Sequence, residues 1–240
     1  MKIIGLTRVR NEEKIIEDTL NHMATFCQTV IVYDDVSDDN TVEICKKHPI
    51  VSKIIIGNNW DSNRARSEYQ TRHAIYLEAR KICDSNDWIV YMDADERICF
   101  DWSILKKQTN IDAIRMKLFD YYITTNDVNK NYYEREWIGP EYRNIIFAFR
   151  FGATTGYHHL DQRECSLKPK SKILHNGYVK HYGKAISVEE WEKTCDYYGN
   201  HFPMYSKKWL NRKGKAIHTK SDFGRPLIKW EDKDKYGIPL

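Results

Sequence analysis

Apolar runs alternate with amphipathic segments across residues 2–92, and this alternation restricts the fold more than any other feature of the chain. Short runs rich in Val, Ile and Tyr are typical of buried strands, whereas apolar residues that recur every three or four positions are typical of helices. Strands that alternate with helices form parallel sheets covered by helices on both faces. The sequence therefore predicts an α/β fold with strands at 2–7, 29–33, 51–56 and 88–92 and helices at 12–26, 41–47 and 64–84.

The pattern changes after residue 110. A chain of 240 residues suits one large α/β domain, and a 41% content of hydrophobic residues can fill a sizeable core. We expect residues 1–110 and 111–240 to be the two halves of that domain, the second ending in a basic, aromatic, loop-like extension. In the second half we expect strands at 113–124, 145–151 and 172–182, a loop at 125–142 and a helix at 187–201 that opens at Ser187.

Two aspartates stand one residue apart where the fourth predicted strand ends, in the segment Trp88–Glu96. Asp is depleted in strands, so the strand should stop at Asp93. Alternate residues of an extended segment face the same way, so Asp93 and Asp95 can point at one position. Their oxygens suit Mg²⁺ or Mn²⁺, which commonly take one or two carboxylates together with substrate phosphates. An ordinary solvated turn is the alternative interpretation of this triplet.

Polar residues also end the first two predicted strands, Thr7 and Arg8 after the first, Asp34 and Asp35 after the second. Ligands of parallel sheets bind beyond the carboxyl ends of the strands, so these residues should share one edge with the two aspartates of the fourth strand. The turn into the following helix, with Asn11 as its expected cap, offers backbone N–H groups that suit phosphate. It contains neither a Gly-x-Gly-x-x-Gly nor a P-loop sequence, which argues against those two nucleotide folds.

Three segments together resemble the family 2-type glycosyltransferases of the GT-A fold, namely Thr7–Glu13, Val30–Thr41 and Trp88–Glu96. The resemblance covers residues 1–100. It implies an inverting, DxD-containing enzyme that moves a sugar from a nucleotide-diphospho sugar to a hydroxyl of a glycan or glycoconjugate, with Mn²⁺ or Mg²⁺ as cofactor. It also implies that residues 1–110 bind the nucleotide sugar, and that residues 111–240 bind the acceptor and include the C-terminal extension.

The same resemblance implies roles for individual residues. Asp35 would pair with the nucleotide base, Asp93 would lie near the ribose or the metal, and Asp95 would hold the metal that bridges the two phosphates. Arg72 matches a basic position that the family often has before its fourth strand and would touch nucleotide or phosphate, although a surface helix arginine is the alternative. The remaining candidates for donor binding are Thr7, Arg8, Asn11, Glu12, Asp34 and Ala94.

The resemblance also implies that the catalytic base lies in the second half of the chain. Asp161 is the first choice, with Glu141 and Glu164 as alternatives, and each could instead be a loop carboxylate paired with an arginine. His175 and His181 fall in one expected strand and face the same side of it. Either histidine could complete the metal sphere or meet a phosphate, or play a structural role.

Charge distribution separates the remaining classes of function. The 38 Lys and Arg residues are spread evenly and nearly balanced by 34 Asp and Glu residues, against expectation for a nucleic-acid-binding module. Two alternatives stay open, a sugar-phosphate nucleotidyltransferase and a non-catalytic nucleotide- or nucleic-acid-binding module. Nucleotidyltransferases of that class usually start with a Gly-rich loop, which residues 5–13 do not contain.

The six cysteines show no metal-type spacing and are typical of thiols in a reducing compartment. The sequence shows neither a signal peptide nor a long apolar span. We therefore expect a cytoplasmic protein without a transmembrane segment, whose partners are a nucleotide sugar and an acceptor rather than nucleic acid. The resemblance implies a role in surface polysaccharide or glycoprotein assembly, with which peripheral contact with a membrane-bound acceptor is compatible.

Overall fold

The computed structural model describes residues 1–61, 63–158, 163–204 and 206–240. Contacts between Cα atoms divide the chain into two compact units. Unit 1 comprises residues 1–116 and 145–177, and unit 2 comprises residues 117–144 and 178–240. No helix among the described residues is both long enough and apolar enough to cross a membrane.

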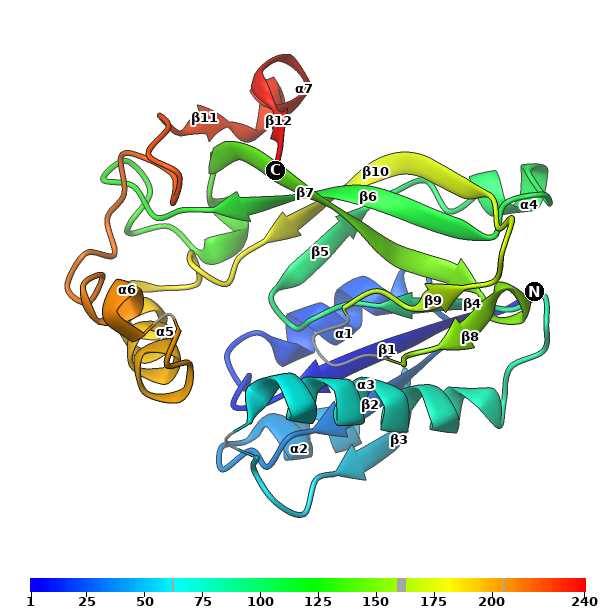
Figure 1. Cartoon of the computed structure of the whole chain (residues 1–240). Coiled ribbons are helices and arrows are strands. Elements are labelled where there is room, and N and C mark those ends of the chain that lie inside the picture. The colour runs from blue at the N-terminus through cyan, green and yellow to red at the C-terminus, as the bar shows by residue number, and fades with distance from the viewer. Residues whose placement is uncertain (62, 159–162, 205) are drawn as a thin grey trace. The chain divides into compact units, whose positions relative to one another are not determined.

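A parallel sheet forms the centre of unit 1 (Figure 1). Its strands are β1 (Ile3–Val9), β2 (Thr29–Asp34), β3 (Val51–Ile56) and β4 (Trp88–Tyr91), in the spatial order β3-β2-β1-β4. Each neighbouring pair among these four is parallel. The four strands that the apolar runs predict are therefore confirmed, and so is their parallel pairing.

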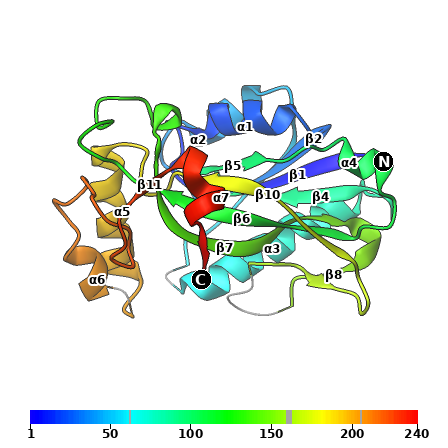
Figure 2. The ribbon, with the colours of Figure 1, turned by 90° about the horizontal axis from the view of Figure 1, so that it is seen from above.

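Helices cover both faces of this sheet, α1 (Ile16–Ala24) and α2 (Thr41–Lys47) on one face and α3 (Arg64–Arg80) on the other (Figure 2). The core between sheet and helices is apolar, and Ile4, Ile75 and Ile89 within it are completely buried. Burial of such a side chain contributes about 1.5–3 kcal/mol to stability. The predicted α/β fold is thus confirmed by the elements of unit 1.

The start of α1 differs from the sequence-based expectation. Asn11 does not cap the helix, which begins five residues later at Ile16. Its backbone has a φ of 55°, its N–H donates to Ser37 Oγ, and its Oδ1 accepts from the N–H of Asp38. Asn tolerates this left-handed conformation better than most residues, and its side chain joins the loop after β2 instead of the helix.

Further strands follow β4 along the chain, and one of them is longer than expected. Among them, β7 begins within residues 125–142, which were expected to be a loop because their composition is polar and aromatic. The C-terminal half of β7 runs antiparallel to β4 in unit 1, with Phe149 opposite Ile89. The elements are β5 (Glu96–Cys99), α4 (Ile104–Lys107), β6 (Ala113–Tyr121), β7 (Trp137–Arg150), β8 (Thr154–Gly156), β9 (Ser166–Leu167) and β10 (Ile173–His181).

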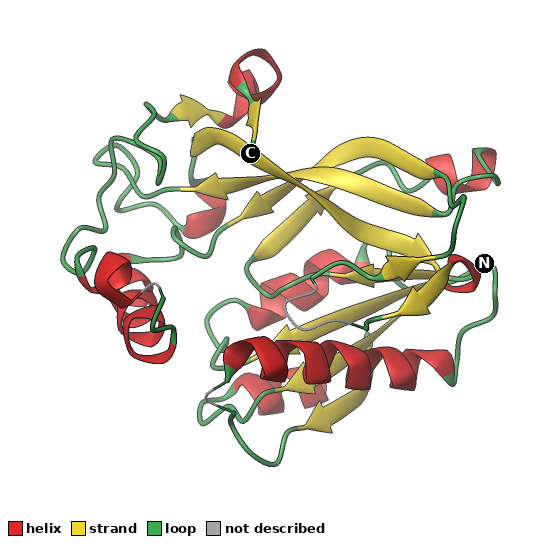
Figure 3. Ribbon diagram, viewed as in Figure 1, coloured by secondary structure: helices red, strands yellow, loops and turns green. Residues whose placement is uncertain are grey.

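Helices and two short terminal strands complete unit 2 (Figure 3). Ser187 opens the expected helix, since its Oγ accepts from the N–H of Glu190 at 3.1 Å. The C-terminal residues are more ordered than their loop-like composition predicts, because β11 and β12 both pair with β7. These elements are α5 (Val188–His201), α6 (Ser206–Leu210), β11 (Ile228–Lys229), α7 (Lys233–Tyr236) and β12 (Ile238–Pro239).

Candidate functional site

The carboxyl ends of β1, β2 and β4 meet at one edge of the parallel sheet in unit 1. The register places Arg8 opposite Tyr33, next to Asp34, and places Leu6 opposite Tyr91, just before the aspartates. The predicted gathering of strand-end polar residues at one edge is therefore present in the structure. In parallel sheets this edge is the usual place for a ligand.

Asp35 is buried at this edge and paired with Arg8. The Nη2 atom of Arg8 donates to Asp35 Oδ2 at 2.9 Å, and only 3% of the Asp35 side chain is exposed. Burial raises the pKa of Asp35 above its ordinary value, and the charges of Arg8 and Arg10 only partly offset this. Arg10 also donates to the backbone oxygens of Asp35 and Val36, at 2.7 and 3.0 Å. Two guanidinium groups thus hold Asp35, Arg8 at its carboxylate and Arg10 at its backbone oxygen.

Arg72 of α3 points to the same edge. Only 5% of this residue is exposed, and its guanidinium carbon lies 5.5 Å from the centre of the Tyr91 ring. Its Nη1 lies 3.5 Å from Glu68 Oε2, and Arg8 Nη1 lies 3.6 Å from Glu68 Oε1. Glu68 therefore holds two guanidinium groups beside Tyr91. The role of Arg72 in touching nucleotide or phosphate stays a prediction.

Asp93, Ala94 and Asp95 form a tight turn between β4 and β5. The N–H of Asp93 donates to Glu96 Oε2 at 2.9 Å, and the N–H of Glu96 donates to the carbonyl of Asp93 at 3.1 Å. The carbonyl of Ala94 accepts from Thr19 Oγ1 at 2.5 Å and from Arg97 Nη1 at 2.8 Å. These hydrogen bonds hold the backbone of the turn, so the two aspartates have a defined position.

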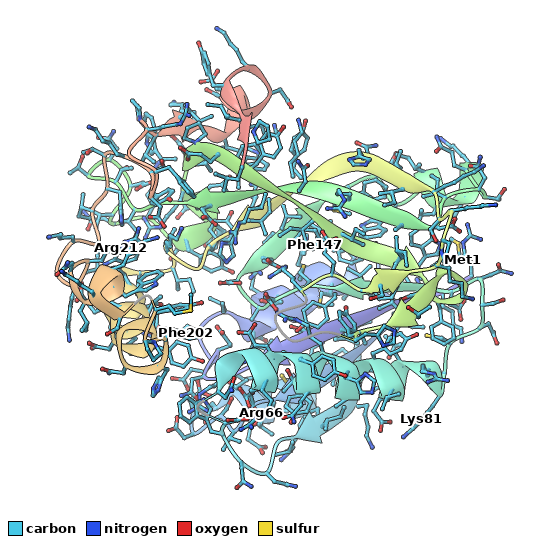
Figure 4. The ribbon with its side chains drawn as sticks, viewed as in Figure 1. Met1, Arg66, Lys81, Phe147, Phe202 and Arg212 are labelled. Atoms are coloured by element: carbon cyan, nitrogen blue, oxygen red, sulfur yellow. The ribbon has the colours of Figure 1, made fainter. Side chains whose placement is uncertain are left out.

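Arg163 binds this turn, a contact that the sequence analysis did not foresee. Its Nη1 donates to Asp93 Oδ2 at 2.6 Å, and its Nη2 donates to the buried carboxylate of Glu96. Its guanidinium carbon lies 5.4 Å from the ring centre of Phe147, which Figure 4 labels. Burial alone would raise the pKa of Asp93, but the positive charges of Arg163, Arg72 and Arg8 outweigh it and lower that pKa below its ordinary value.

Several polar atoms at this edge are buried without a hydrogen-bond partner among the described residues. They are Thr7 Oγ1, Arg8 Nε, Asp34 Oδ1 and Tyr91 Oη, from the ends of β1, β2 and β4. An unsatisfied buried donor or acceptor costs about 1–3 kcal/mol, so such atoms usually have a partner. Their position at the edge where parallel sheets bind ligands is compatible with a polar ligand.

The residues of the turn fit a divalent metal. Among the described residues there is no group of three or more His, Cys, Asp and Glu arranged to hold an ion. A catalytic Mg²⁺ or Mn²⁺ needs only one or two carboxylates when substrate phosphates supply further oxygens. The guanidinium of Arg163 on Asp93 shows that a carboxylate of this turn already attracts a cation. Asp93 and Asp95 therefore have the chemistry that the predicted metal role requires.

The residues named for the base lie in different settings. Glu164 accepts two bonds from Arg115, at 2.8 and 2.7 Å, and one from the N–H of Ile146. Glu141 of unit 2 is buried and accepts from Ser221 Oγ at 3.0 Å. Asp161 lies outside the residues that the structure describes. The role of base stays a prediction for all three carboxylates.

The two histidines named as metal ligands both lie on β10. His175 is exposed, whereas His181 belongs to unit 2 and its Nδ1 lies 2.5 Å from Asp120 Oδ1. Asp120 also accepts from Arg143 and Lys184, at 2.6 and 2.7 Å. Burial opposes ionisation of Asp120, but Lys184, Arg143 and His181 hold its pKa well below the ordinary value. The metal roles of His175 and His181 stay predictions.

The backbone N–H of Glu12 donates to Thr41 Oγ1 at 2.7 Å, so this N–H already has a hydrogen-bond partner within the protein. Sequence reasoning missed Glu68, Tyr91, Glu96 and Arg163 as members of the site. Glu96 directly follows the aspartates and Tyr91 stands two residues before them, and this proximity in the sequence was the available signal. Arg163 gave no such signal, since it lies 70 residues from Asp93 in the sequence.

Comparison with known proteins gives partial sequence matches. No family model matches the chain. Uncharacterized proteins of Mycobacterium bovis and Mycobacterium tuberculosis are each 29% identical to it over 103 residues. This match covers 40% of the chain and 23% of each relative, so the chain spans about a quarter of the length of these curated relatives.

Solved structures similar to this chain include three of low sequence identity. Glucosyl-3-phosphoglycerate synthase from Mycobacterium tuberculosis, with Mn²⁺, uridine diphosphate and glucosyl-3-phosphoglycerate, has a TM-score of 0.30 at 14% identity, over 54% of this chain and 47% of that one. A 4-diphosphocytidyl-2C-methyl-D-erythritol synthase has a TM-score of 0.38 at 13% identity, over 63% and 76%. A candidate nucleotide-diphospho-sugar transferase from Desulfovibrio desulfuricans has a TM-score of 0.40 at 10% identity, over 88% and 95%.

Proposed function

We propose that this chain is a metal-dependent, inverting glycosyltransferase that uses a nucleotide-diphospho sugar. The observation that carries the proposal is the edge of the parallel sheet in unit 1. There the carboxylate turn, the buried Arg72, the half-buried Arg8 and unsatisfied polar atoms lie together at the carboxyl ends of β1, β2 and β4. These groups match the parts of a nucleotide-diphospho sugar: a polar base and ribose, a diphosphate and its counter-ion.

Each residue of the edge would have a definite task. Asp35 would accept a hydrogen bond from the base, once Arg8 turns from it toward the diphosphate. Arg72 would hold phosphate oxygens, since a guanidinium matches them in shape and charge. Asp93 and Asp95 would hold the divalent metal, which when bound offsets the negative charge that develops on the leaving diphosphate.

The acceptor hydroxyl would attack the anomeric carbon from the face opposite the leaving group, which inverts that centre. A carboxylate would take the hydroxyl proton as the carbon–oxygen bond forms. We assign this role to Asp161, with Glu141 and Glu164 as the alternatives. The acceptor would be a glycan or glycoconjugate of surface polysaccharide or glycoprotein assembly.

The direct test is donor turnover by the purified full chain. We expect release of nucleoside diphosphate from one of a panel of UDP-, GDP-, dTDP- and CDP-sugars, dependent on Mn²⁺ or Mg²⁺. Asp95→Asn should reduce this rate at least about a hundredfold, the usual scale for a lost electrostatic contact to the transition state. Asp196→Asn, which removes an exposed carboxylate paired with Lys213, is the matched control and should leave the rate unchanged.

Two results would contradict the proposal. Full activity in Asp95→Asn would remove the metal role of that residue. Release of pyrophosphate from a nucleoside triphosphate and a sugar 1-phosphate, without turnover of any nucleotide sugar, would instead identify a nucleotidyltransferase.

A further inference from the structure

A single guanidinium group joins two carboxylates of the turn after β4. Arg163 donates through Nη1 to Asp93 Oδ2 at 2.6 Å and through Nη2 to Glu96 Oε1. The two ends of this bridge differ in burial. Glu96 is completely buried, whereas 29% of the Asp93 side chain and 26% of the Arg163 side chain are exposed. The bridge therefore has one end in the protein interior and one end that a ligand can reach.

The buried end of the bridge is costly to break. An ionised carboxylate in the interior needs a charged or hydrogen-bonding partner, and loss of such a partner destabilises a protein by several kcal/mol. Glu96 also accepts from the N–H of Asp93 through its other oxygen, so it fixes the turn itself. The contact between Arg163 and Glu96 is thus structural, and it keeps the guanidinium at the turn.

At the exposed end of the bridge, the Arg163 guanidinium is the counter-ion of Asp93. Asp93 Oδ2 is one of the oxygens that a divalent metal would use, and the guanidinium already lies within hydrogen-bond distance of it. A metal cation and this guanidinium would repel each other at that distance. Binding of a metal through Asp93 Oδ2 therefore requires Arg163 Nη1 to leave that oxygen.

The released end of Arg163 would need a new anionic partner. Asp93, the partner that it leaves, lies close enough to Arg8 and Arg72 that their charges also act on it. A diphosphate brought in with the metal would supply anionic oxygens beside these arginines. A guanidinium pairs with phosphate oxygens at least as well as with a carboxylate.

We propose that Arg163 is a donor-binding residue that exchanges partners: it holds Asp93 in the free protein, and it pairs with the diphosphate of the donor when the metal takes Asp93. This inference rests on the proposed function and adds a specific residue to it. Arg163 would accordingly weaken the binding of metal alone and strengthen the binding of the nucleotide with metal. Metal and nucleotide would then bind cooperatively, because the metal displaces Arg163 from Asp93 and the diphosphate pairs with the displaced guanidinium.

The test measures two affinities in the full chain, that of Mn²⁺ alone and that of UDP or another nucleoside diphosphate at saturating Mn²⁺. Arg163→Gln should raise the first affinity about three- to tenfold and lower the second by a similar factor. Opposite changes are the signature of partner exchange, since general damage to the site would lower both. Isothermal titration measures both affinities, and electron paramagnetic resonance of free Mn²⁺ gives an independent value for the first.

Two further variants keep the test valid if Arg163→Gln unfolds. Arg163→Gln combined with Glu96→Gln removes the buried carboxylate together with its partner, which proteins often tolerate. This double variant should show the same opposite changes. Arg212→Gln is the matched control, because Arg212 also pairs with a carboxylate, Asp222 of unit 2, and its side chain has a similar exposed fraction of 17%. It should change neither affinity.

An unchanged or lower Mn²⁺ affinity in the folded variants would overturn the inference, as would an unchanged nucleotide affinity. Absence of Mn²⁺ binding in both the natural protein and the double variant would overturn it as well. These results are separate from the turnover assay. Partner exchange can fail while sugar transfer persists, and it can hold in a protein that turns over no sugar donor.

Discussion

Individual side chains at the edge of the sheet neutralise one another in the free protein. Asp35 pairs with Arg8, Asp93 and Glu96 pair with Arg163, and Glu68 lies near two arginines. Under the proposed function, a ligand at this edge would replace these pairs with its own charges.

Val36, directly after Asp35, has a φ of 62°. This left-handed conformation is unfavourable for a β-branched residue and costs about 1–2 kcal/mol, whereas glycine adopts it freely. We therefore expect Val36→Gly to raise the free energy of unfolding by on the order of 1 kcal/mol, measured by scanning calorimetry. Val51→Gly, in the extended strand β3, is the control and should lower it. A lower stability of Val36→Gly would show that side-chain packing outweighs the strain.

Asp120 of unit 2 connects three elements, because its carboxylate pairs with Arg143 of β7, with His181 of β10 and with Lys184 in the following loop. Lys184 in turn lies 2.9 Å from Asp222 Oδ2, and Arg212, labelled in Figure 4, lies 2.8 Å from Asp222 Oδ1. The strands and the C-terminal segment of unit 2 are thus joined by one charged network. Its strength should depend on pH.

The pKa of Asp120 lies well below its ordinary value of 3.8 in the folded protein. A group with a lowered folded pKa stabilises the protein fully above its unfolded pKa and loses that contribution as the pH falls toward the folded pKa. Asp120→Asn should therefore cost on the order of 3 kcal/mol at neutral pH and less as the pH falls below about 4. Urea unfolding of both proteins between about pH 3 and 7 measures this difference. An equal difference at every pH would contradict the assigned pKa.

Local patterns explain which elements sequence reasoning found. The strands β1 to β4 are short, apolar and separated by amphipathic helices, so local periodicity predicts them and topology then brings Arg8, Asp35 and Asp93 to one edge. The start of β7 was missed because residues 125–142 have the polar, aromatic composition that was interpreted as a loop. The pairings of Arg163 with Asp93 and of Asp120 with His181 span 70 and 61 residues, and no local pattern encodes them.

The whole chain comprises two units with different chemistry. Unit 1 holds the parallel sheet, the carboxylate turn and the unsatisfied polar atoms at its edge. Unit 2 holds an aromatic core around Tyr121, Ile138 and Tyr182 and the network of Asp120. We propose that the edge of unit 1 binds a nucleoside diphosphate together with a divalent metal.

Thermal unfolding of the full chain in the presence of nucleotides tests this claim most directly. The panel would contain UDP, GDP, CDP, dTDP and their sugars, each with and without Mn²⁺. A ligand at a hundred times its Kd stabilises the folded state by about 2.7 kcal/mol, which corresponds to a rise in Tm of roughly 5–10 °C for a chain of this size. We expect such a rise with one nucleotide, only when Mn²⁺ is present, and not in Asp95→Asn. No rise with any nucleotide, or an equal rise in Asp95→Asn, would contradict the account.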